Sequence, residues 1–150
     1  MRLSAHFDLC EFTRSESAKR EGIDNSPTPE HLENIKILCE KVLEPLRVHF
    51  NHSIKISSGY RSNLLNHYIG GTLKSQHLEG KAVDIDLDGT SYGTTNKMIF
   101  NYILKNLNFD QLINEHNYSW VHVSYNKDNN RKQVLDAKKD NGKTVYSLHK

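Results

Sequence analysis

Side chains able to bind a metal ion or move a proton are concentrated in the middle third of the chain. The segment SQHLEGKAVD (75–84) contains a histidine, His77, and an aspartate, Asp84, seven positions apart across a glycine. A catalytic zinc ion takes three protein ligands of the nitrogen or oxygen type and leaves a fourth position to water. Two donors are too few, so a third must come from elsewhere in the chain.

His122 is the best candidate for the third donor. It lies in the apolar run WVHVSY (120–125), where the alternation of a strand places His122 on one face with Trp120 and Ser124. We expect His77 on a loop and Asp84 in a second strand. A histidine on a strand can then reach a site that it shares with both.

An ordinary structural role is the alternative for each of these residues. His77 and Asp84 would be polar surface residues, and His122 would be a hydrogen-bonded core histidine. Spacing by itself leaves both interpretations open. Against a surface role, Asp84 lies in the apolar run AVDI (82–85), where a carboxylate is costly unless it meets a cation or several donors. A metal ion would offset that cost.

Two helices and a set of short strands are expected to position these residues. Apolar residues at helical spacing predict a helix that begins at Thr28 and Pro29 and runs to Arg47, and a second from Thr94 or Thr95 to Leu107. Short apolar runs predict strands over 54–58, 81–87, 110–115 and 120–125. The last part of the chain predicts a hairpin from 133–135 and 145–148, with its turn at 140–142. The fold class expected is α+β.

Composition limits the classes of protein to consider. The 150 residues are 25% charged and 36% hydrophobic, which predicts one globular domain over residues 1–150 with a modest core. A formal charge of +2 without a concentrated basic stripe argues against nucleic-acid binding. Asp8 and Glu11 interrupt the N-terminal stretch, so we expect no secretory signal, no membrane insertion and synthesis in the cytoplasm. We also expect the protein to be a monomer. Cys10 and Cys39 are interpreted as small buried hydrophobic residues and not as a disulfide.

Five motifs in a fixed order resemble those of a known enzyme family. The chain resembles the zinc D-Ala-D-Ala carboxypeptidase family, which includes the L-alanyl-D-glutamate endopeptidases used as phage endolysins. The resemblance implies the Hedgehog/DD-peptidase fold, with a small antiparallel sheet and flanking helices around a zinc site. It also implies that the Zn²⁺ ligands are His77, Asp84 and His122. The motifs are SGYRS (58–62), Gly70–Gly71, SQHLEGKAVDI (75–85), DQLINE (110–115) and WVHVSY (120–125).

The same resemblance implies roles for three further residues. Glu115 matches the catalytic glutamate, which would accept the proton of the attacking water and pass it to the leaving amine. Its spacing to the third ligand differs from the short Glu-x-x-His arrangement of some relatives, so His116 stays an alternative base. Arg61 resembles the arginine that polarises the scissile carbonyl or holds a substrate carboxylate. Ser75 either orients the substrate or caps the turn before His77.

The function implied is hydrolysis of peptide bonds in the stem peptides of bacterial peptidoglycan. The motifs do not choose between a D-Ala-D-Ala carboxypeptidase and an L-Ala-D-Glu endopeptidase. The alternative is a binding module or a phage structural module that keeps the metal site without turnover, and the presence of Glu115 and Arg61 argues against it. We expect the protein to act on the cell wall after release from the cytoplasm, or to be carried in a phage particle.

Overall fold

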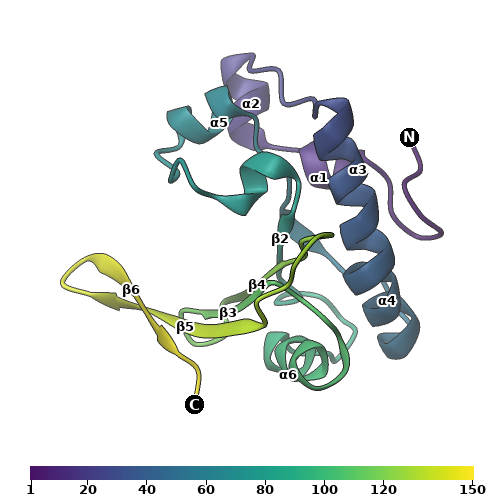
Figure 1. The fold of residues 1–150 in the computed structure, drawn as a ribbon, viewed down its shortest axis with the longest axis vertical. Helices are drawn as coiled ribbons and strands as arrows, with labels where there is room; N and C mark the ends of the chain where they lie inside the picture. Colours follow the sequence, from purple (N-terminus) through teal and green to yellow (C-terminus); the bar gives the residue numbers. More distant parts are fainter.

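The computed structural model describes residues 1–150 as helices arranged around one sheet (Figure 1). In chain order the helical elements are α1 (Cys10–Thr13), α2 (Glu16–Glu21), α3 (Pro29–Leu38), the π-helical η1 (Cys39–Leu43), α4 (Glu44–Phe50), α5 (Asn63–Tyr68), the 3-10 turn η2 (Gln76–Glu79) and α6 (Asn96–Asn106). The strands are β1 (Ile56–Ser58), β2 (Ala82–Ile85), β3 (Gln111–Glu115), β4 (Trp120–Ser124), β5 (Gln133–Asp140) and β6 (Lys143–Leu148). None of the helices is both long and apolar enough to cross a membrane.

Both predicted helices are present. The first begins where Thr28 accepts a hydrogen bond from the backbone N–H of His31, and it continues through η1 into α4 three residues beyond the predicted end at Arg47. The second begins at Asn96, where the Thr95 side chain accepts from the N–H of Met98. The short elements α1, α2, α5 and η2 were not predicted, because none is long enough to show a full helical period.

The long helix supplies one side of the hydrophobic core. Its apolar stripe packs with strand residues in a cluster of 21 buried side chains. Cys39 lies in this stripe with no exposed surface, and burial raises the pKa of its thiol to about 12. The expectation of a buried thiol is wrong for Cys10, which is exposed, and both cysteines are free thiols.

The sheet has six strands in the order β1-β2-β4-β3-β5-β6. All neighbouring strands are antiparallel except β3 and β5, which run parallel. The expectation of an antiparallel sheet is therefore wrong at this one pair, and the sheet is mixed. Strand β4 ends beside the beginning of β3, and the connection that follows stays at this end of the sheet, so β5 runs in the same direction as β3.

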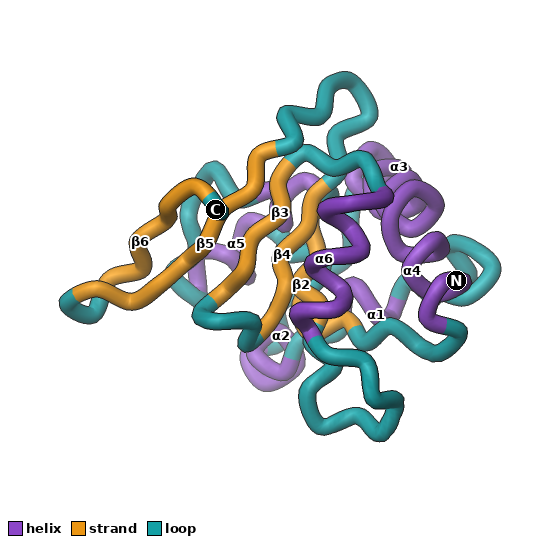
Figure 2. The backbone as a smooth tube through the Cα atoms, turned by 90° about the horizontal axis from the view of Figure 1, so that it is seen from below, coloured by secondary structure: helices purple, strands orange, loops and turns teal.

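The two faces of the sheet have different partners, and Figure 2 shows α6 lying across one of them. Helix α6 packs against β3 and β4 on one face, where Leu112, Val121 and Val123 are fully buried. Because side chains alternate along a strand, the residues between them point to the other face. That face holds His122 and Glu115.

The turn that follows β1 makes a close backbone contact with α1. A Cβ atom on Gly59 would lie 2.7 Å from both the Cα and the carbonyl oxygen of Phe12, which is itself buried. The next residue, Tyr60, donates its N–H to the Phe12 carbonyl at 2.7 Å. Only glycine fits at the second position of SGYRS, because backbone atoms fill the space that a side chain needs.

We predict that Gly59→Ala lowers the free energy of unfolding by about 1–3 kcal/mol, since the added methyl group must push α1 away from β1. Urea unfolding followed by circular dichroism measures this change. Ser53→Ala, at an exposed serine just before the same strand, is the control and should stay within about 0.5 kcal/mol of the parent protein. An unchanged urea midpoint for Gly59→Ala would contradict the close contact.

Candidate metal centre

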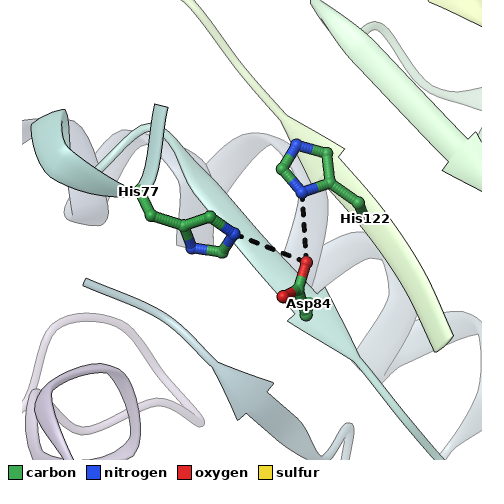
Figure 3. A group of neighbouring side chains, drawn as sticks. All are labelled: His77, Asp84 and His122. Carbon is green, nitrogen blue, oxygen red and sulfur yellow. Dashed lines mark hydrogen bonds and ion pairs between the residues drawn. The ribbon is translucent and has the colours of Figure 1, made fainter. Parts of the chain in front are cut away.

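Three side chains from separate elements meet on the face of the sheet opposite α6 (Figure 3). His77 comes from η2, Asp84 from β2 and His122 from β4. Asp84 and His122 are directly opposite each other in the β2–β4 pairing. One nitrogen of each imidazole and one Asp84 oxygen all lie within 4.8 Å of one another. The structure thus brings together the three residues that the sequence proposes as ligands.

The Asp84 carboxylate is the common partner of the two imidazoles. Its Oδ1 atom lies 3.1 Å from His122 Nδ1 and 3.5 Å from His77 Nε2. Burial tends to raise the pKa of this carboxyl, but the contacts with His122 and His77 outweigh burial and hold the pKa well below its ordinary range. Asp84 is therefore an anion at neutral pH, as a metal ligand must be.

The orientation of His77 is fixed by the backbone of the β1 turn. Its Nδ1–H donates to the Gly59 carbonyl at 2.6 Å, so Nε2 carries the lone pair and faces Asp84. Burial lowers the pKa of His77, which keeps the ring neutral at pH 7. A ligating histidine usually donates its second ring nitrogen to a carbonyl or carboxylate in this way. A neutral imidazole and a carboxylate, with a second imidazole beside them, match the donor set of a three-ligand zinc site.

The turn η2 is held against helix α3. Asn34 donates from its side-chain amide to the Glu79 carbonyl at 2.9 Å. Gly80, which ends the turn at φ 72°, lies so close to α3 that a Cβ would meet the His31 carbonyl oxygen at 2.5 Å. The long helix therefore sets the height of His77 above the sheet.

A cleft of about 600 Å³ contains the three side chains. One wall is the segment between α5 and η2, and the floor is the open face of the sheet from β2 to β6. The lining includes Trp120. Tyr60 is buried against His31, and Tyr68 is half-exposed on α5 with its hydroxyl bonded to Glu21.

Glu115 lies in this cleft at the end of β3, with 7% of its surface exposed. Burial raises the pKa of Glu115, and the nearby Asp84 adds to this effect while His122 opposes it. The neighbouring His116 takes the opposite side of the chain and lines a separate pocket with Asp136. Of the two candidate bases, Glu115 is the one that faces the metal centre.

Arg61 and Ser75 also line the cleft. The segment around Arg61 is held by the buried Asn25, which donates to the Tyr60 carbonyl and accepts from the Ser62 N–H. Burial lowers the pKa of the Arg61 guanidinium although Asp84 opposes this, and its Nε atom is buried without a partner. Ser75 accepts from the His77 N–H at 3.3 Å, so it does cap the turn.

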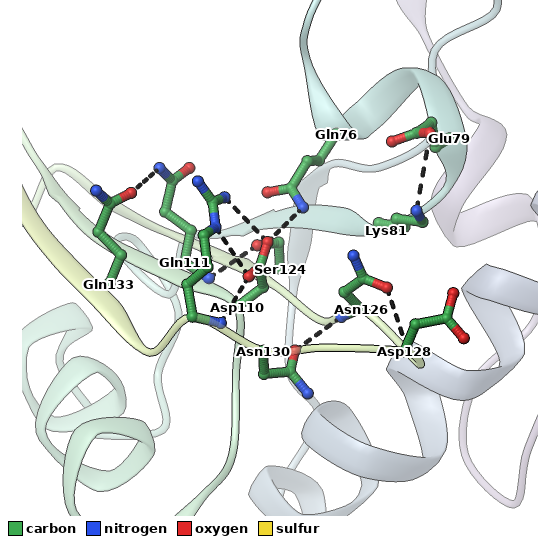
Figure 4. Close-up of polar contacts among 11 residues, drawn as sticks. Gln76, Glu79, Lys81, Asp110, Gln111, Ser124, Asn126, Asp128, Asn130 and Gln133 are labelled. Atoms are coloured by element: carbon green, nitrogen blue, oxygen red, sulfur yellow. Dashed lines mark hydrogen bonds and ion pairs between the residues drawn. The ribbon is translucent and has the colours of Figure 1, made fainter.

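A polar network that the sequence did not predict connects η2 to the beginning of β3 (Figure 4). Asp110 is 3% exposed and accepts three hydrogen bonds from Arg131, two of them from the guanidinium at 3.0 Å. It also accepts one from the Gln76 amide at 2.8 Å. Gln76 precedes His77, so this network supports the metal centre from the side of the β4–β5 connection.

Two comparisons place the chain among known proteins. A family model described as Peptidase M15 matches residues 5–124. No curated protein matches the chain. The matched residues include every side chain of the candidate metal centre and end at the last residue of β4.

We predict that His77→Ala, Asp84→Ala and His122→Ala each weaken zinc binding by more than about 100-fold, because each removes one of three donors. Metal content after dialysis, measured by atomic absorption, tests this prediction. His67→Ala removes an exposed histidine on α5 and should keep the zinc content of the parent protein. Full zinc content in any of the three ligand variants would refute the assignment.

We also predict that Asp110→Asn lowers the free energy of unfolding at pH 7 by about 1–3 kcal/mol. Burial raises the pKa of Asp110, but the hydrogen bonds from Arg131 and Gln76 outweigh it and lower the pKa below 3.8. The carboxylate's contribution is thus fully present above pH 3.8 and is lost as the pH falls through the lower folded-state pKa.

Urea unfolding of the two proteins between about pH 7 and pH 3 should therefore show their difference shrinking only at the acidic end. Asp128→Asn changes an exposed carboxylate in the same connection and is the matched control. A difference that is the same at every pH would show that the charge of Asp110 is not what stabilises the fold.

Proposed function

Because the chain belongs to the peptidase M15 family, we propose that it is a zinc metallopeptidase that hydrolyses peptide bonds in the stem peptides of bacterial peptidoglycan. One observation carries this proposal. The group of His77, Asp84 and His122, of which His77 is buried and the other two are partly exposed, lies in the same cleft as a glutamate and an arginine. Amide hydrolysis requires a group that activates water, a base that moves the proton and a cation that stabilises negative charge, and this cleft contains residues for all three.

The proton transfers are assigned to Glu115. A bound zinc ion would act as a Lewis acid and make a water molecule easier to deprotonate near neutral pH. The Glu115 carboxylate accepts the proton from the attacking water and returns it to the leaving amine. Burial raises the pKa of Glu115, which brings it closer to neutral pH and makes the carboxyl better suited to both transfers.

Binding of negative charge on the substrate is assigned to Arg61. Its guanidinium is partly desolvated, and Nη1 lies 3.4 Å from the Asn66 side-chain oxygen. The remaining N–H groups can donate to a carbonyl oxygen that gains negative charge during attack, or to a carboxylate of the substrate. A fixed guanidinium in a cleft is worth more than one in water, because less solvent screens it.

The shape of the cleft favours an endopeptidase. In the strand order, Arg61 follows β1 on one side of the metal centre, and Leu135 and Tyr146 lie on β5 and β6 on the other. A groove lined on both sides of the reacting bond accommodates a peptide that continues in both directions. We therefore propose cleavage within the stem peptide, of the L-Ala-D-Glu type, over removal of a terminal D-alanine.

Mass spectrometry of purified peptidoglycan after digestion tests both levels of the proposal. New amino and carboxyl termini inside the stem peptide support the endopeptidase, and release of free D-alanine would replace it by the carboxypeptidase. If the zinc-loaded protein binds peptidoglycan but cuts no bond, the enzyme assignment fails and a binding module takes its place.

The proposed substrate lies outside the cytoplasmic membrane. We propose that the protein reaches it as a lysin, after another protein opens the membrane, or as part of a phage particle. Addition of the purified protein to intact cells and to permeabilised cells distinguishes these routes, since only a wall that the protein can reach will be digested.

We predict that Glu115→Gln lowers kcat by roughly 10²–10⁴-fold while zinc content stays at the level of the parent protein. The amide has the shape of the carboxylate but cannot accept the proton. Glu33→Gln, on the exposed side of α3, controls for the loss of a negative charge. Near-normal turnover by Glu115→Gln would remove Glu115 from the mechanism.

A further inference from the structure

Side chains on the open face of the sheet form two rows that cross the strands. Pairing places residues directly opposite one another, and opposite residues point to the same face. The first row continues from the metal centre into apolar side chains, and the second contains the proposed base. The rows are Asp84, His122, Ile113, Leu135 and Leu148, and Trp120, Glu115, Ala137 and Tyr146.

The second row places an aromatic residue on each side of Glu115. Trp120 is directly opposite Glu115 on β4, and on the other side Ala137 of β5 separates Glu115 from Tyr146 of β6. Ala137 is buried and has only a methyl group, so it leaves room above it. Both aromatic residues line the cleft.

Tyr146 is close enough to Glu115 and Asp84 for their charges to change the pKa of its phenol. Burial raises the pKa of its phenol, and the carboxylates of Glu115 and Asp84 raise it further. The phenol is therefore neutral at pH 7. Its side chain is still 54% exposed, so the ring presents apolar surface to whatever enters the cleft. An aromatic ring that is half-covered beside a cleft is a typical contact for a ligand.

The position of Tyr146 is not explained by the fold. The adjacent residues Val145 and Ser147 point to the other face of the sheet, and Leu148 at the end of the first row is largely exposed. The hairpin of β5 and β6 also lies beyond residues 5–124, which the family model matches. This hairpin continues the sheet beyond β3 (Figure 1), and its residues Leu135 and Tyr146 line the cleft.

We propose that Tyr146 is a substrate-positioning residue, and that its ring and Leu135 form an apolar subsite for the part of the stem peptide on the β6 side of the cleaved bond. This proposal rests on the proposed function. The subsite is continuous with the metal centre through Ile113, which is opposite both His122 and Leu135. An aliphatic stretch of peptide that packs against the ring and Leu135 is held with its reacting carbonyl near Glu115.

Kinetics on soluble muropeptides, released from peptidoglycan by a muramidase, test this subsite. We expect Tyr146→Ala to raise KM about tenfold and to leave kcat within about twofold, because the ring contributes to binding and not to proton transfer. Tyr146→Phe keeps the ring and should restore KM to within about twofold of the parent value. Val145→Ala, exposed on the opposite face of the same strand, should match the parent protein.

Binding can be measured without turnover in the zinc-loaded Glu115→Gln protein. The chain has one tryptophan, Trp120, and it lines the cleft, so its fluorescence reports the entry of a muropeptide. Adding Tyr146→Ala to this background should raise the Kd about tenfold, in parallel with KM. The urea midpoint should stay unchanged, which separates a binding role from a structural one.

Several outcomes would overturn the subsite. They are an unchanged KM and Kd for Tyr146→Ala, a loss confined to kcat, or a Tyr146→Phe variant as impaired as Tyr146→Ala. In each of these cases the parent protein still cuts muropeptides and the proposed function stands. If the parent protein neither binds nor cuts them, the proposed function itself fails, and the subsite fails with it.

Discussion

The Asp84 carboxylate lies in an interior strand and is almost closed off from water, so its charge must be offset within the protein. Two imidazoles meet one of its oxygens at 3.1 and 3.5 Å. A carboxylate so far removed from water is costly unless a cation or several donors face it, and a divalent cation bound between the three side chains would meet that need. The rest of the fold positions the two histidines beside this carboxylate. Strand pairing places His122 opposite Asp84, and η2 brings His77 over them.

Packing far from the cleft reaches the metal centre through a short series of contacts. Phe12 lies against Gly59, and the Gly59 carbonyl accepts the hydrogen bond that fixes the tautomer of His77. Helix α3 fixes the other end of the same turn through Asn34. The ligand that lies outside the sheet is thus held on two sides, by a backbone carbonyl and by the buried Asn34 side chain.

Local signals in the sequence predicted much of the structure, but features that depend on contacts between distant segments were not predicted. Apolar spacing identified both main helices, and alternation placed His122 on a polar face of its strand. The parallel partner of β3 could not be predicted, because strand order depends on contacts between segments that have no common local pattern. For the same reason the sequence did not reveal Tyr146 as a cleft residue. Asp110 lay inside a recognised motif, yet its partner Arg131 is 21 positions away.

The Asp110–Arg131 contact also has a consequence for the hairpin that follows it. Arg131 is bound to Asp110 just before β3, and the Gln133 N–H donates to the Asp110 carbonyl as β5 begins. These bonds fix where β5 starts relative to β3. A slip of a single residue at this point would turn every side chain of β5 and β6 to the opposite face of the sheet. Leu135 and Tyr146 would then leave the cleft, and sequence neighbours such as Asp136 and Ser147 would take their places. One buried carboxylate at the beginning of a strand therefore keeps the far end of the cleft apolar.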